Sequence, residues 1–356
     1  MIDLESIKQL AIRQPEPVFS LYLQVDNSLQ ENQADQPAWR IYMKNALESI
    51  SDTGIRERVE AFFEDYEPDS RGLALFYGQD LEQVYALPVL PIENAHHFGK
   101  LQLAPLLWLV DEYEPYLIVL VDQDEAHFLT TFLGNLEREE AMASDRFTFD
   151  FRERTLMPRQ GNPARPGAHV TSGSKRDEFD DMMDDYIRRF HQDVAQRIRE
   201  MLRERRAQRL LLGGSEKAAH AVKDALHSEA GAAFVALVHV PLQENDSEVA
   251  QRMLPAALKY EREQEAALVN QVIDFARAGG RGALGVENVN KVLEMQQVEL
   301  LVASWPSQQQ ETLERMMVET LRQGGQVELV HGDAAAMLDN VGGIAARLYY
   351  AIQPST

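Results

Sequence analysis

Residues 283–303 read Ala-Leu-Gly-Val-Glu-Asn-Val-Asn-Lys-Val-Leu-Glu-Met-Gln-Gln-Val-Glu-Leu-Leu-Val-Ala, and their pattern indicates the fold class. Apolar runs predict strands over 283–286 and 299–303, and the helical spacing of apolar residues between them predicts a helix over 288–294. The same alternation continues to the end of the chain, with a helix over 309–322, a strand over 327–330, another helix, and a last apolar run over 344–352. Strands that alternate with helices in this way are typical of an α/β/α sandwich.

A second α/β unit is predicted before this one. It opens with the apolar run Tyr116–Val121, and the turn residues Gly134-Asn135 predict a hairpin of central strands. Apolar residues at helical spacing then predict a long amphipathic helix from Asp177 to about Arg206. Strands predicted over 210–212 and 234–240 complete a mixed or parallel sheet.

The chain begins with a smaller α/β unit. Its apolar, β-prone runs predict three strands, and apolar residues at helical spacing predict two helices between the first and second strands. The strands are predicted over 18–23, 73–77 and 84–87, and the helices between Ala38 and Phe63.

Two boundaries separate these units. Pro115 disfavours continuation of the helical pattern before it, and residues 243–248 are polar and precede a long helix predicted over 256–278. The chain is therefore predicted to form three consecutive α/β domains, at residues 1–113, 114–245 and 246–356.

The composition is that of a globular protein, with 45% hydrophobic and 26% charged residues among 356. The net charge of −22 repels phosphate backbones at long range, so any contact with RNA must be local. The chain has no cysteine, which excludes disulfides and thiolate chemistry. It shows neither a signal-peptide pattern nor an apolar run of about 20 residues, so we expect a cytoplasmic protein without membrane contact.

One segment departs from this acidic average. Between Arg146 and Arg176 the chain carries seven Lys or Arg residues against Asp150 and Glu153, and five Gly or Pro residues fall between Pro158 and Gly167. We expect a mobile, basic loop that contacts RNA through its cations and two polar neighbours. The predicted RNA-binding residues are Arg146, Arg152, Arg154, Arg159, Gln160, Arg165, His169, Lys175 and Arg176.

Two other patterns favour ordinary structure over a ligand site. The segment Leu212–Ser215 joins a strand to a helix, but its glycine spacing fits no phosphate-binding motif, and Ser215 is predicted to cap the helix. The carboxylates at 180, 181, 184 and 185 share one helix face, as expected for a solvated acidic surface, and Asp122 with Asp124 adds no calcium-loop pattern. We therefore predict neither a metal site nor a cofactor, and no histidine has an assignable catalytic partner.

Several of these segments resemble one family, the eukaryotic and archaeal class-one release factors, Pelota, and their bacterial relatives. The run 116–122 with Leu133-Gly134-Asn135, and the run 210–215, are similar to the middle domain of that family. Residues 285–295 followed by 298–302 resemble its C-terminal domain most specifically. The opening 18–23 and the ending 342–348 look like the bacterial branch, so the resemblance covers nearly the whole chain.

The resemblance implies an RNase H-like middle domain with a long basic loop and a C-terminal domain that resembles ribosomal protein L7Ae. In the family a Gly-Gly-Gln loop before a long helix positions water at the peptidyl-tRNA ester. Here the matching segment, 160–176, contains no Gly-Gly-Gln. Gly324-Gly325-Gln326 does occur, but it follows a helix in the third unit, where paired glycines predict a helix C-cap.

Two functional hypotheses follow from the resemblance. The first is a non-catalytic translation factor that binds the A site of stalled or hibernating ribosomes. Its basic loop would contact rRNA and the tRNA acceptor end, and an elongation-type GTPase would be a partner. The alternative is a peptidyl-tRNA hydrolase or nuclease that uses another loop residue, with Gln160 or His169 as the candidates.

Overall fold

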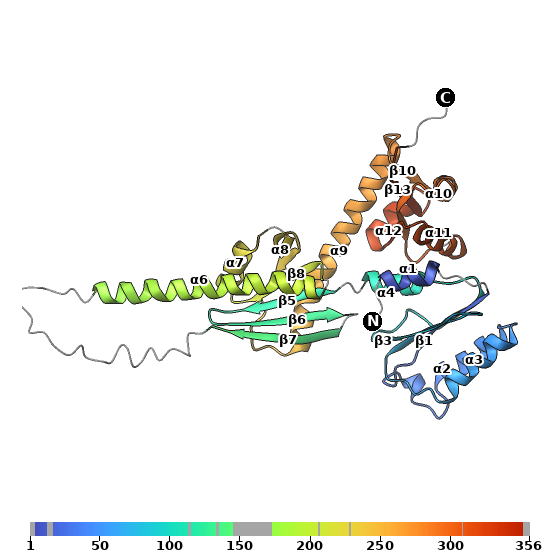
Figure 1. The fold of residues 1–356 in the computed structure, drawn as a ribbon, viewed down its shortest axis with the longest axis horizontal. Coiled ribbons are helices and arrows are strands. Elements are labelled where there is room, and N and C mark those ends of the chain that lie inside the picture. Colours follow the sequence, from blue (N-terminus) through green and yellow to red (C-terminus); the bar gives the residue numbers. More distant parts are fainter. Residues whose placement is uncertain are drawn as a thin grey trace, which may run out of the picture. The chain divides into compact units, whose positions relative to one another are not determined.

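The computed structural model describes residues 4–12, 17–112, 115–132, 135–144, 173–205, 207–227, 229–307 and 309–351. The chain divides into two compact units. Unit 1 comprises residues 1–114 and 259–356, and unit 2 comprises residues 115–258. The described residues form three sheets (Figure 1), so the mixed α/β fold class predicted from the sequence is confirmed. The three-domain division and the RNase H-like and L7Ae-like assignments stay predictions.

Unit 2 contains one mixed five-stranded sheet. Its strands are β5 (Tyr116–Val121), β6 (Glu125–Phe132), β7 (Asn135–Ala143), β8 (Arg209–Gly214) and β9 (Phe234–Leu237), in the order β7-β6-β5-β8-β9. The first three pair antiparallel, whereas β5, β8 and β9 run parallel. The predicted hairpin is therefore present, and β5 coincides with its predicted range.

Helices cover both faces of this sheet. Residues at alternate positions of β5, such as Val119, pack against α6 (Gly173–Glu204), α7 (Glu216–Ala225) and α8 (Glu229–Ala232). The residues between them, such as Ile118, pack against the first part of α9 (Asp246–Arg277). Burial on both faces explains why β5 is apolar at every position.

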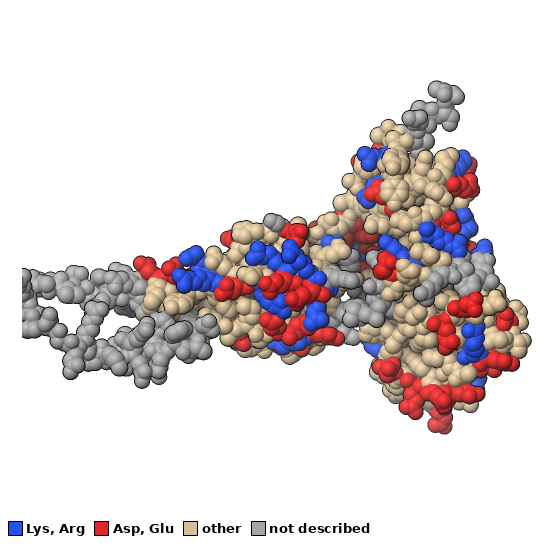
Figure 2. All heavy atoms as spheres, viewed as in Figure 1, with Lys and Arg blue, Asp and Glu red and all other residues tan. Residues whose placement is uncertain are grey.

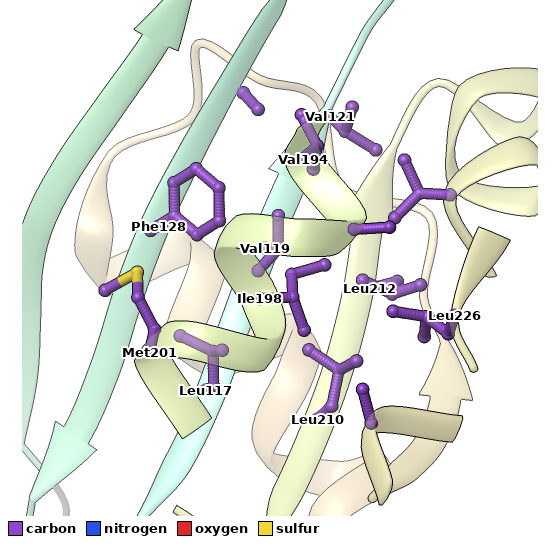
Figure 3. Close-up of a cluster of buried hydrophobic side chains, with 14 of the residues drawn as sticks. Leu117, Val119, Val121, Phe128, Val194, Ile198, Met201, Leu210, Leu212 and Leu226 are labelled. Atoms are coloured by element: carbon purple, nitrogen blue, oxygen red, sulfur yellow. The ribbon is translucent and has the colours of Figure 1, made fainter. Parts of the chain in front are cut away.

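The core on the α6 side forms where the apolar face of α6 packs against alternate residues of the strands. Figure 3 shows Val194, Ile198 and Met201 of α6, at helical spacing, against alternate residues of β5 and β8 and against Phe128 of β6. All of these side chains are buried, and each contributes about 1.5–3 kcal/mol relative to an exposed position. Besides Phe128, the labelled strand residues are Leu117, Val119, Val121, Leu210 and Leu212.

The N-terminal part of unit 1 is an antiparallel sheet with the order β3-β2-β1-β4. Trp39 and Phe63, from two neighbouring helices, are buried against one face of it. The strands are β1 (Val18–Gln24), β2 (Gly72–Tyr77), β3 (Glu82–Leu87) and β4 (Ala95–Gly99). The helices are α1 (Leu4–Ile12), the 3-10 helix η1 (Gln30–Asn32), α2 (Ala38–Glu48), α3 (Thr53–Glu64) and α4 (Ala104–Glu112).

The C-terminal part of unit 1 has a four-stranded sheet with the order β10-β13-β11-β12, in which β11 and β12 are parallel. The second half of α9 and α12 pack on a core with Leu300, Val302 and Val330. The strands are β10 (Gly282–Leu284), β11 (Val298–Ser304), β12 (Gln326–Val330) and β13 (Ile344–Leu348), and the helices are α10 (Val286–Glu294), α11 (Gln310–Arg322) and α12 (Gly332–Asp339). Among the described helices, none combines the length and the apolar character needed to cross a bilayer.

Candidate functional site

The basic segment predicted to bind RNA lies mostly outside the described residues. This applies to Arg146, Arg152, Arg154, Arg159, Gln160, Arg165 and His169. The backbone of Lys175 and Arg176 is described, and both belong to the start of α6, which begins at Gly173 and not at the predicted Asp177. These two cations are therefore helical residues, and their predicted role in RNA binding stays a prediction.

The acidic residues that follow on α6 lie on a solvated surface. Asp181, Asp184 and Asp185 are exposed, and Asp185 forms an exposed ion pair with Arg188 at 3.0 Å. No group of three or more potential metal ligands occurs in the part of the chain that the structure describes. The absence of a metal site at these carboxylates stays a prediction.

The turn between β8 and α7 is explained by backbone packing. Gly214 has φ +96° and pairs with Val121 of β5, and a Cβ at this position would lie 2.1 Å from the Val121 carbonyl oxygen. Only glycine fits this close approach. Ser215 occupies the N-cap position of α7, as predicted, although its side chain makes no capping hydrogen bond.

A groove of about 860 Å³ lies between α6 and α7 near the carboxyl ends of β5 and β8. Its charged lining is balanced, because it contains the three cations Arg188, Arg199 and Lys217 and the three carboxylates of Asp184, Asp193 and Asp224. In sheets with parallel strands, ligands bind at the carboxyl ends of the strands. The position suits a ligand, but the mixed charge selects neither an anion nor a cation.

His191 is one of the residues that line this groove. Its Nε2 lies 3.2 Å from the Asp122 carbonyl oxygen, which only accepts, so Nε2 carries the proton. Burial lowers the pKa of His191 and so favours the neutral imidazole. The hydrogen bond to Asp122 ties α6 to the end of β5. The sequence offered only a weak signal for this residue, a histidine directly after Phe190 in the apolar stripe of α6.

Carboxylates surround two arginines at the end of α6. The Arg197 guanidinium donates to Glu204, Glu140 and Glu200, at 3.1 Å, 2.9 Å and 3.2 Å in the closest contacts, and these carboxylates raise its pKa. Arg205 pairs with Glu139. Over unit 2, Lys and Arg side chains lie among Asp and Glu side chains (Figure 2). Glu139 and Glu140 of β7 pair with the arginines at the end of α6.

The literal Gly-Gly-Gln of the chain has a structural role. Helix α11 ends at Arg322, Gly324 has φ +83°, and the Gly324 and Gly325 amides donate to the carbonyl oxygens of Leu321 and Thr320 at 3.1 Å and 2.9 Å. This pair of hydrogen bonds defines a Schellman C-cap. Gln326 is exposed and begins β12, so the predicted helix termination is confirmed.

Glu314 is the most deeply buried acid among the described residues of unit 1, and the sequence prediction missed it. The Glu314 carboxyl group is 2% exposed and accepts hydrogen bonds from the amides of Leu103, at 2.8 Å, and Ala104, at 3.0 Å and 3.1 Å. It thereby satisfies the first amides of α4 from a helix more than 200 residues away. Burial raises the pKa of Glu314 to about 7. The available signal was its place on α11 beside Leu313 and Met316, among apolar residues.

Comparison with known proteins places part of the chain in a family context. Residues 102–258, which include all of unit 2, match the model described as bacterial archaeo-eukaryotic release factor family 10. No curated protein matches the chain. The resemblance inferred from the sequence is therefore confirmed for this region.

Three solved structures illustrate the similarity. Archaeoglobus fulgidus Pelota is 13% identical, over 99% of this chain and 93% of its own, with a TM-score of 0.38. Saccharomyces cerevisiae Dom34, described as a translation termination-like factor, is 10% identical over 98% and 94%, with a TM-score of 0.47. An archaeal translation termination factor, aRF1, is 15% identical over 97% of both chains, with a TM-score of 0.27.

Proposed function

We propose that this chain, which matches the archaeo-eukaryotic release factor family over residues 102–258, is a ribosome-binding translation factor. In this proposal it occupies the A site of stalled or hibernating ribosomes and does not hydrolyse peptidyl-tRNA. The observation that carries the proposal is the family match of unit 2, the unit that also contains the basic segment 146–176.

The charge distribution supports local contact with RNA. The whole chain carries −22, whereas the segment 146–176 has seven cations and two carboxylates. Phosphate groups are therefore repelled by the net charge of the chain and attracted by this segment. Contact of this segment with rRNA and with the tRNA acceptor end is part of the proposal.

The absence of peptidyl-tRNA hydrolysis is proposed from the sequence and supported by the C-cap at the end of α11. The segment before α6 lacks Gly-Gly-Gln, and the Gly-Gly-Gln at 324–326 is accounted for by helix termination in unit 1. A glutamine that begins a strand after a Schellman cap has no reason to inherit a catalytic role. An elongation-type GTPase as partner and a cytoplasmic location complete the proposal.

Sedimentation tests the proposal directly. Lysates from growing and from starved cells are separated on sucrose gradients, and the protein is followed with one antibody. We expect it in ribosomal fractions, and enriched there under starvation. Absence from every ribosomal fraction in both conditions would show that the proposed function is wrong.

A further inference from the structure

A second groove in unit 2 has an excess of positive charge. It has a volume of about 680 Å³ and is bordered by the end of α6, the start of β8, and α8. Three guanidinium groups line it, those of Arg199, Arg203 and Arg209, against the single carboxylate of Glu229. We propose that this groove binds the phosphate backbone of single-stranded RNA.

The contrast with neighbouring arginines supports an external partner. Arg197 and Arg205 are held by carboxylates of β7 and α6, whereas Arg199 and Arg203 lie beyond that network. Arg203 pairs with Glu229 at 2.9 Å, but both side chains are more than 70% exposed. Such an exposed pair contributes little to stability, so a phosphate can replace the carboxylate at small cost.

The rest of the lining fits a backbone and not a base. Apart from its charged residues and Leu202, the groove is lined by Gln208, His227 and small side chains, namely Ala207, Ala230, Ala232 and Ala233. Small walls allow a sugar-phosphate chain to approach the guanidinium forks closely. Among the described residues of the lining there is no aromatic side chain except His227, so stacking of successive bases has no platform. Binding should therefore be independent of RNA sequence.

The groove also continues along the helix. Arg199 and His227 line both this groove and the groove between α6 and α7. An extended strand bound at the basic end would pass Arg199 toward Lys217. The inference rests on the proposed function only in taking RNA as the partner, and it adds a second contact surface to the predicted loop.

The test compares the full-length protein with two double variants by fluorescence anisotropy. The probe is a short labelled oligouridylate, titrated at several KCl concentrations. Arg199→Gln with Arg203→Gln should lower affinity about tenfold and reduce the slope of log affinity against log salt by about 1.4, because each lost phosphate contact removes roughly 0.7. Arg199→Lys with Arg203→Lys keeps the charge and should retain most of the slope.

Arg189→Gln is the matched control. Arg189 is an exposed arginine of the same helix that lines neither groove, so affinity and slope should not change. Thermal unfolding of each variant separates lost binding from lost folding. Equal slopes for the wild type and the glutamine double variant, or no binding of the probe by the wild type, would overturn the proposal. The proposal would also be overturned if labelled polyglutamate competed with the oligouridylate and bound more tightly, because the groove would then bind an acidic protein segment.

The two proposals fail separately. If the protein is absent from ribosomal fractions but the glutamine variant loses oligouridylate binding, the groove stands and the proposed function is wrong. If the protein sediments with ribosomes while oligouridylate binding is unaffected by the variant, the proposed function stands and the groove proposal is wrong.

Discussion

Glu314 is a residue whose environment makes a pH-dependent contribution to stability. Its pKa is raised by burial from 4.5 to about 7, so the folded chain holds this proton more tightly than the unfolded chain. The contribution to stability is therefore complete below about pH 4.5 and is lost as the pH rises through 7. The protonated form still accepts the amides of α4 through its carbonyl oxygen.

The variant Glu314→Gln should remove this dependence, because the amide is neutral at all these pH values. We expect the free energy of unfolding of the wild type, relative to the variant, to fall by on the order of 3 kcal/mol between pH 4.5 and pH 8. Urea unfolding at several pH values measures it. Glu311→Gln, at an exposed position of the same helix, is the control, and an equal slope for both variants would contradict the assignment.

The glycine and glutamine residues after α11 make a second prediction at this scale. A Cβ at Gly325 would lie 2.7 Å from Thr320 Cγ2 and 2.9 Å from the Val298 carbonyl oxygen. Gly325→Ala should therefore lower the free energy of unfolding by about 1–3 kcal/mol, whereas Gln326→Ala should be nearly silent. Chemical unfolding and ribosome sedimentation measure the two effects. Loss of ribosome association in Gln326→Ala at unchanged stability would show that the tripeptide acts outside helix termination.

Among the elements, the basic segment and the start of α6 carry the main binding prediction. Replacing Arg159, Arg165, Lys175 and Arg176 with Ala should weaken ribosome binding and flatten its salt dependence, since each cation that neutralises a phosphate releases counterions. Sedimentation at several salt concentrations measures both quantities.

The control for this variant follows from the ion pairs of α9. Arg262 bridges Glu112 and Glu265, so its removal would disturb the fold. Arg277→Ala, at an exposed position in the last turn of the same helix, is the better control and should change neither quantity. An unchanged salt slope in the quadruple variant would leave the segment without its predicted role.

Strongly patterned elements were predictable from sequence, and those defined by their partners were not. Strand β5 was predicted with its observed bounds, because a strand buried on both faces is apolar throughout. Strand β4, with two histidines in five residues, was missed because its pairing with β1 and not its own pattern makes it a strand. Helix α9 begins at Asp246 and not at 256, since Asn245 caps it by accepting the Glu248 amide at 3.0 Å.

The same distinction applies to the candidate sites. Excess charge in a linear segment is visible in the sequence, so the basic segment could be predicted. The groove lined by Arg199, Arg203 and Arg209 could not, because β8 and α6 meet only in the folded unit. Glu314 and His191 depend in the same way on partners that are distant in the chain.

For the whole molecule, the principal prediction concerns chemistry on the ribosome. Purified protein should release no peptide from ribosome-bound peptidyl-tRNA above the rate without protein, because the segment before α6 lacks Gly-Gly-Gln. A release assay with labelled peptidyl-tRNA measures it, with an active release factor as the positive control. Release that disappears in Gln160→Ala would favour the hydrolase hypothesis.

The discontinuity of unit 1 has a consequence for the order in which the protein is completed during synthesis. Unit 2 is one continuous segment and ends at residue 258, so all of its residues have left the exit tunnel before the last strands of unit 1 are made. The amides of Leu103 and Ala104, by contrast, obtain their acceptor only when Glu314 emerges. The first amides of α4 therefore lack this acceptor while some 200 further codons are translated, and unit 1 is the last unit to complete its fold.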